Sequence, residues 1–228
     1  MIYTRYWNEG TAIISESVEY EPPAILAEQA GAEAYAKDIR GIARAVWQDL
    51  PIYAYATMWD TVGLGIGAAW RDGAATCGIS ENELSLEEKT RRDEIVMEQR
   101  SYVPGFLDWV YAHRRDGPDK LLWRDILPRT VLWANAWDRT YNEAMVRACS
   151  DQKIRWVLHG ERVTKEPCRD CLRLDGRIYR SSIWAKYEIY PKVSALACGG
   201  WRCGCSWGEV GADEKVTPGR PPNLAGQR

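Results

Sequence analysis

The chain of 228 residues contains only two histidines and one phenylalanine. Histidine is the commonest general base in enzymes, so its scarcity leaves histidine-based catalysis with little to work with. The sequence also lacks a nucleophile-elbow motif, a His-Glu-x-x-His motif and a glycine-rich phosphate loop. We therefore expect a protein that is not an enzyme.

Targeting and membrane-spanning signals are also missing. The N-terminus has no basic region followed by an apolar run, so we expect no secretory signal and a reducing compartment. The stretch from Pro51 to Trp70 is long enough to span a bilayer, and Asp60 is its only charged residue. A carboxylate at its centre is costly in a membrane, and three glycines dilute its apolar character. We therefore expect a buried or interface helix there and no membrane association.

Basic residues are too dispersed to favour strong non-specific binding of DNA. Residues 1–150 carry 16 Lys and Arg against 23 Asp and Glu, whereas residues 151–210 carry 11 against 7. The chain is therefore acidic over most of its length and mildly basic only in its cysteine-rich part. Because nucleic-acid-binding proteins usually concentrate basic residues on one face, we expect weak, strongly salt-dependent DNA binding at most.

Residues 1–150 are predicted to form a mainly helical body, with a short strand within residues 13–18 before the first helix. Apolar residues recur at helical spacing over residues 24–49 and 104–115. Between these two segments, Ser80-x-x-Glu83 and Ser85-x-x-Glu88 are possible capping boxes, and one of them is expected to open a charged helix.

A further helix is predicted from Pro128, a residue that suits a first helical turn, to about Cys149. Glu143 is expected to lie off its apolar face. The residues predicted to form that face are Val131, Ala134, Tyr141, Met145 and Ala148.

The sequence changes character after Asp151. Strands are predicted over residues 154–158 and 177–180, and residues 211–228 are rich in proline and glycine with few large apolar side chains. The predicted fold is therefore α+β. It consists of a mainly helical body (1–150), a zinc-stabilised β-rich module (151–210) and a flexible tail (211–228).

Five of the seven cysteines fall within 38 residues, namely Cys168, Cys171, Cys198, Cys203 and Cys205. A Cys-x-x-Cys turn lets two thiolates reach one ion, and a second cysteine group about thirty residues later closes a tetrahedron. Gly199, Gly200 and Gly204 permit the tight backbone that such a site needs. We expect one structural zinc ion, bound by the first two cysteines and by two of the other three.

Two other interpretations of the cluster are open. Disulfides are disfavoured by the odd number of clustered cysteines, and a redox Cys-x-x-Cys is disfavoured because such a motif normally opens a helix. Here the motif precedes Leu172–Gly176, which is predicted to be a turn. Cys77 and Cys149 stand apart and are expected to be small buried apolar residues. His113 and His159 are expected to have packing or surface roles rather than to bind metal.

Three segments, Lys153–Val163, Cys168–Gly176 and Arg202–Cys205, resemble the phage head morphogenesis family, the Mu-type minor head proteins. In that family a strand with tryptophan precedes a Cys-x-x-Cys turn, and a segment with two closely spaced cysteines closes the unit. Cys198 stands where the family often has histidine. The resemblance extends mainly over residues 125–207.

The resemblance implies a non-catalytic minor capsid protein that is present in the virion, inside the head or near the portal, and in the host cytoplasm during assembly. It implies the portal protein and other phage head proteins as partners, in support of procapsid assembly or DNA delivery. The helical body is expected to make these contacts because it offers surplus apolar surface. That surface is predicted from Pro51–Trp70 and from Trp109, Trp123, Trp133 and Trp137.

The competing interpretation is a zinc-ribbon module that binds nucleic acid. It is based on the arginines of the cysteine-rich part, namely Arg155, Arg162, Arg169, Arg173, Arg177 and Arg180.

Overall fold

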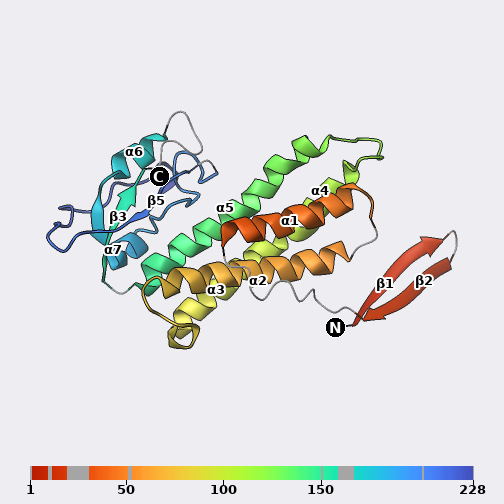
Figure 1. Ribbon diagram of the computed structural model, residues 1–228, viewed down its shortest axis with the longest axis horizontal. Coiled ribbons are helices and arrows are strands. Elements are labelled where there is room, and N and C mark those ends of the chain that lie inside the picture. The colour runs from red at the N-terminus through yellow and green to blue at the C-terminus, as the bar shows by residue number, and fades with distance from the viewer. Residues whose placement is uncertain are drawn as a thin grey trace.

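The computed structural model describes residues 2–9, 12–19, 31–50, 53–149, 151–158, 167–201 and 203–227. Its long helices form an elongated bundle, and a small module packs at the C-terminal end of α5 (Figure 1). The architecture is α+β and mostly helical, as predicted. The bundle consists of α1 (Ala32–Trp47), α2 (Ala54–Ala75), α3 (Leu86–Ser101), α4 (Val103–Ala112) and α5 (Trp123–Ala148).

The module contains a three-stranded antiparallel sheet in the order β4-β3-β5. Both strands that the sequence predicted after residue 151 are present, as β3 and β4, whereas β5 is too short to have been recognised. The module's elements are β3 (Lys153–Val157), α6 (Arg169–Leu174), β4 (Ile178–Arg180), α7 (Ser181–Lys186) and β5 (Ser206–Gly208).

The N-terminal strand prediction corresponds to one half of a hairpin. Strands β1 (Ile2–Glu9) and β2 (Ala12–Glu19) pair antiparallel along their full lengths. The first predicted helix is confirmed over α1, and the part of that prediction that covers residues 24–30 lies outside the described residues.

Helix α2 lies at the centre of the bundle. Met58, Val62, Ile66 and Trp70 are fully buried in the core that the five helices share. None of the helices in the described ranges combines the length and apolar character that a bilayer span requires. The prediction of a buried helix is therefore confirmed over the described part of this segment.

Both capping boxes form. Ser85 accepts a hydrogen bond from the backbone N–H of Glu88 and opens α3, the predicted charged helix. Ser80 and Glu83 close the same reciprocal arrangement around a short 3-10 turn, η2 (Glu81–Glu83). These local pairs satisfy backbone donors that would otherwise lack partners at the start of a helix. Because both partners lie within four residues, the sequence pattern predicts the two helix starts correctly.

Helix α5 begins earlier than predicted. It starts at Trp123, so Pro128 lies inside the helix rather than in its first turn. Proline has no N–H, so the carbonyl of Arg124 loses its usual helical donor. Both residues are exposed, and water can supply the missing hydrogen bond.

The buried face of α5 also differs from the predicted one. Val131 is 52% exposed, whereas Trp133 and Trp137 are core residues. The prediction is right for Ala148 and wrong for Val131, and threonines complete the buried face. Thr130 and Thr140 bury their hydroxyls by donating to the carbonyl oxygens of Leu127 and Ala136 within the helix.

Glu143, expected to lie off the apolar face, is also buried. It accepts hydrogen bonds from Arg91 Nε at 2.8 Å, Arg147 Nε at 3.0 Å and Tyr190 Oη at 2.7 Å. Burial alone would raise the pKa of Glu143, but these hydrogen bonds outweigh it and the pKa is lowered. Since Tyr190 belongs to the module, this carboxylate joins α3, α5 and the module.

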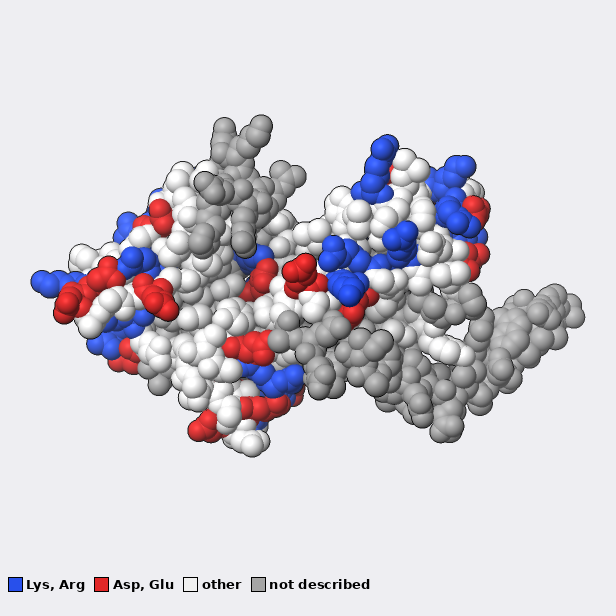
Figure 2. Space-filling view, in the orientation of Figure 1, with Lys and Arg blue, Asp and Glu red and all other residues white. Residues whose placement is uncertain are grey.

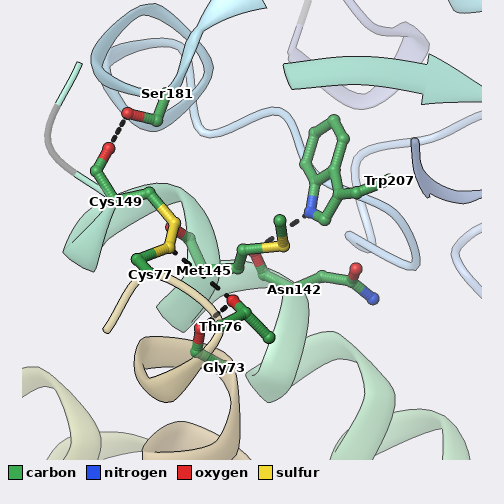
Figure 3. Close-up of a disulfide and its surroundings, with 8 residues drawn as sticks. All are labelled: Gly73, Thr76, Cys77, Asn142, Met145, Cys149, Ser181 and Trp207. Atoms are coloured by element: carbon green, nitrogen blue, oxygen red, sulfur yellow. Dashed lines mark hydrogen bonds between the residues drawn. A yellow bond between two sulfur atoms is a disulfide. The ribbon is translucent and has the colours of Figure 1, made fainter. Parts of the chain in front are cut away.

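Cys77 and Cys149 are not the separate apolar residues that the sequence predicted. They form a disulfide, with Cα atoms 5.1 Å apart, between the C-terminal ends of α2 and α5 (Figure 3). Cys149 also offers its carbonyl oxygen to the hydroxyl of Ser181, the first residue of α7. Their separation of 72 residues hid the pair, because only the packing of α2 on α5 brings the two cysteines together.

The tail contacts the module over its described part. Thr217 N donates to Ile178 O at 2.7 Å, Ile178 N donates back to Thr217 Oγ1 at 2.9 Å, and Leu224 is buried in the module core. The C-terminus accordingly lies within the module (Figure 1). Specific contacts with the module therefore form in a segment whose composition, rich in proline and glycine, favours flexibility.

Glycines in α2 allow neighbouring helices to approach closely. A Cβ atom at Gly65 would lie 2.3 Å from the ring of Tyr35 in α1, and one at Gly73 would lie 2.3 Å from the backbone oxygen of Tyr141 in α5. The glycines that diluted the apolar character of this segment therefore serve helix packing.

Replacing Gly73 by alanine is expected to lower the free energy of unfolding by about 1–3 kcal/mol, because the Tyr141 carbonyl cannot rotate away. Gly67→Ala is the matched control, since its Cβ would lie at an ordinary 3.7 Å from Arg71 Nη1. Higher helix propensity should make that variant more stable by about 0.5–1 kcal/mol. Urea unfolding measures both, and equal stabilities would contradict the close packing of α2 on α5.

Candidate metal centre

All five clustered cysteines come together in the module. The Sγ atoms of Cys168, Cys171 and Cys198 lie within 4.8 Å of one another, and so do those of Cys171, Cys203 and Cys205. Cys171 is common to both groups, so the five sulfurs form two overlapping sets of three. The structure therefore brings together every cysteine that the sequence proposed as a ligand.

The Cys-x-x-Cys motif opens a short helix, contrary to the predicted turn. Cys168 is the N-cap of α6, and its sulfur accepts a hydrogen bond from the backbone N–H of Cys171 at 3.4 Å. The turn lies directly after this helix, at Asp175 and Gly176. Because the motif does open a helix, its local structure is no longer an argument against a redox role. The three further cysteine sulfurs near this pair still disfavour that role.

Two glycines shape the loop that carries the second cysteine group. Gly199 and Gly200 have φ angles of 63° and 77°, a conformation that side chains rarely adopt. A Cβ atom on Gly200 would also lie 2.3 Å from the carbonyl oxygen of Lys192. This tight turn between Cys198 and Cys203 is what allows both sulfurs to face the Cys-x-x-Cys pair.

The sulfurs form two groups of three that share Cys171, and a tetrahedral site requires four of them to meet at one ion. Metal–sulfur bonds of about 2.3 Å in a tetrahedron place the sulfurs about 3.8 Å apart. Cys171 Sγ lies 3.9 Å from Cys203 Sγ, and Cys168 Sγ lies 3.2 Å from Cys171 Sγ. Cys171, Cys203 and Cys205 are buried and the other two are half-buried, so the cluster is closed rather than open to water.

The thiols perturb one another strongly. Hydrogen bonding to Cys198 first, and then to Cys203 and Cys205, raises the pKa of Cys171. The corresponding bond from Cys171 lowers the pKa of Cys203, and bonds from Cys171 and Cys203 lower that of Cys205 to about 4. The lowered pKa values of Cys203 and Cys205 favour the thiolate form, which is the form that binds a metal ion. A bound cation would replace the remaining thiol protons.

Asp170 supports the centre from inside the Cys-x-x-Cys motif. Its Oδ2 accepts hydrogen bonds from the backbone N–H of Ala197 at 2.9 Å and of Ala225 at 3.0 Å. Its Oδ1 has no hydrogen-bond partner among the described residues and lies 3.6 Å from Arg173 Nη1. One buried carboxylate therefore fixes the residue before Cys198 and the end of the tail.

Sequence reasoning missed Asp170. The sequence did contain an indication of its role. A carboxylate between two thiolates is repelled by them, so its presence there suggests that it has hydrogen-bond partners elsewhere. Its two backbone partners, however, lie 27 and 55 residues further along the chain, and no spacing rule connects them.

The histidines do not contribute to the described centre. His113 ends α4, where its Nδ1 lies 2.8 Å from the carbonyl oxygen of Trp109 and its ring packs on that tryptophan. The packing role expected for it is confirmed. His159 lies outside the described residues.

Comparison with known proteins gives no relative from which to transfer a role. No protein-family model, no curated protein and no solved structure matches the chain. The chemistry of the centre therefore follows from its own residues. These are five sulfur donors, enclosed by short elements and stabilised by a buried carboxylate.

Replacing Asp170 by alanine is expected to release the tail, because two backbone N–H groups lose their acceptor at a cost of about 1–3 kcal/mol. Limited proteolysis should then cut residues 211–227 faster than in the parent protein. The matched control is Asp213→Ala, which removes an exposed carboxylate from the tail itself. If both variants resist protease like the parent, Asp170 does not anchor the tail.

Proposed function

We propose that this chain is a non-catalytic minor capsid protein of a tailed phage, which supports head assembly or DNA delivery at the portal. Its C-terminal module is held by one structural zinc ion. The observation that carries this proposal is the convergence of five cysteine sulfurs, three of them buried, because a zinc ion bound by four cysteines has no open position for a substrate or a catalytic water.

Zinc is the ion that suits this donor set best. Soft thiolates in a tetrahedral arrangement favour zinc or iron–sulfur clusters, and a four-cysteine zinc site is structural. The ligands are Cys168, Cys171, Cys198 and Cys203. Cys203 is the fourth ligand from the second sulfur group, and Cys205 of that group is the alternative.

The phage assignment is supported by how the three resembling segments fold. The first contains β3, the second contains α6, and the third leads directly into β5, which pairs with β3. The buried Trp156 of β3 packs edge-to-face against Trp207 of β5 at a centroid distance of 5.5 Å. Segments that carry the resemblance in sequence thus form one continuous unit, as expected if they share an origin with the family.

The nucleic-acid alternative is weakened by the partners of its arginines. Arg155 pairs with Glu214, Arg173 lies 3.6 Å from Asp170, and Arg180 Nη1 lies 2.6 Å from Asp151 Oδ2. On the face shown in Figure 2, basic and acidic side chains also lie next to one another on the module. Charges neutralised within the chain release few counterions on binding DNA, which disfavours this alternative.

Contacts with other head proteins are assigned to the helical body, but through other side chains than the tryptophans predicted from the sequence. Trp133 and Trp137 are buried in the bundle core and are not surplus surface. The body instead exposes Tyr102, between α3 and α4, and Leu132 of α5, with exposed fractions of 54% and 39%. Both line one hollow of the surface, and exposed apolar side chains that lie together are typical of protein interfaces.

The test is co-purification with the portal. An affinity-tagged chain produced in infected cells is expected to sediment with procapsids and to elute with the portal protein. Cells infected with a phage that lacks the portal gene supply the control, in which the tagged chain should not co-elute with head proteins. A chain that is a free monomer, absent from procapsids and virions, would contradict the proposed function.

A further inference from the structure

A cleft of about 630 Å³ separates the helical body from the module. One wall is formed by the end of α3 and the start of α4, the floor by α5, and the other wall by residues 192–201. This volume lies within the range of pockets that bind ligands or side chains of a partner. The cleft is separate from the sulfur cluster, although both share the loop between Cys198 and Cys203.

The cleft combines exposed apolar groups with an uncompensated positive charge. Tyr102, Leu132 and Trp201 line it with exposed fractions of 54%, 39% and 57%. Arg129, at the same cleft, stacks over the Trp109 ring at 3.8 Å and has no carboxylate partner among the described residues. Arg139 is paired only loosely, with its Nη2 atom 3.6 Å from Glu98 Oε1.

We infer that this cleft is a docking site for a short segment of a partner protein that carries large apolar side chains next to a carboxylate. The apolar walls take the side chains, and Arg129 pairs with the carboxylate. Arginine is suited to this role because its guanidinium forms two parallel hydrogen bonds to a carboxylate while it stacks on an aromatic ring. The inference deepens the proposed function, because it locates the contact with a head protein.

The metal centre builds one wall of the cleft. Trp201 lies between the ligands Cys198 and Cys203, and its carbonyl oxygen accepts a hydrogen bond from Asn135 Nδ2 of α5 at 2.9 Å. If the loop loses its metal anchor, Trp201 is no longer held at the cleft. Binding of the segment is therefore expected to depend on bound zinc, although no metal contacts it.

The experiment begins with a display library of random peptides of about a dozen residues, selected on the full-length protein with zinc present. Enriched sequences are expected to pair aromatic or aliphatic residues with Asp or Glu. The strongest peptides are then synthesised with a fluorescein label, and their affinity is measured by fluorescence anisotropy with zinc and after chelation.

Gly105→Leu tests the cleft directly. Gly105 lines the cleft, and a Cβ atom added there meets no other atom within 4 Å, so leucine fills the space without disturbing the fold. It should weaken peptide binding by about tenfold or more, as should Arg129→Gln. The matched control is Gly41→Leu in α1, which also adds a side chain in open space but away from the cleft. It should leave binding unchanged.

Failure to enrich any peptide above bait-free controls, or enriched peptides that bind Gly105→Leu as well as the parent, would overturn the inference. So would a fluorescein-labelled thymidine oligonucleotide that binds the parent tightly and Gly105→Leu poorly, because the cleft would then take nucleic acid. The two proposals fail separately. If peptides bind at the cleft but the chain does not co-purify with the portal, only the proposed function is contradicted. If the Gly105→Leu variant still co-purifies with the portal, only the assignment of the contact to the cleft is contradicted.

Discussion

Five cysteine sulfurs converge around the buried Cys171 and bring distant segments of the module together. Among the described residues from 151 to 227, the longest strand has five residues and the longest helix has six, so regular hydrogen bonding contributes little long-range order there. A metal ion that joins thiolates from α6 and from the loop after α7 would connect parts of the chain that are about thirty residues apart. Such binding energy is folding energy, because the site does not exist in the unfolded chain.

Two buried carboxylates extend this organisation beyond the sulfurs. Asp170 fixes the tail and the residue before Cys198, while Glu143 joins α3 and α5 to Tyr190 of the module. Each accepts at least two hydrogen bonds, which offsets the cost of burying a charge. The orientation of the module on the bundle, and hence the shape of the cleft between them, therefore follows from a few charged contacts as well as from apolar packing.

Local sequence patterns predicted the features that local interactions determine. The Ser85 capping box, the helices flanking it, strands β3 and β4 and the cysteine ligand candidates all follow from spacing within a few residues or from one repeated motif. The failures concern long-range contacts. Pairing of Cys77 with Cys149, the anchoring of the tail on Asp170 and the buried Glu143 depend on partners between 27 and 72 residues away. The buried face of α5 failed for a different reason, since threonines that satisfy their own hydroxyls pack like apolar residues.

Elemental analysis of the purified protein, with cysteine variants in parallel, tests the metal-centred account most directly. We predict about one zinc ion per chain in the parent and in Cys205→Ser, because a four-thiolate site is complete without Cys205. Cys171→Ser should lose the zinc and unfold the module, since Cys171 belongs to both sulfur groups. A parent protein that contains no metal, with its clustered cysteines paired as disulfides in mass spectra, would contradict the account.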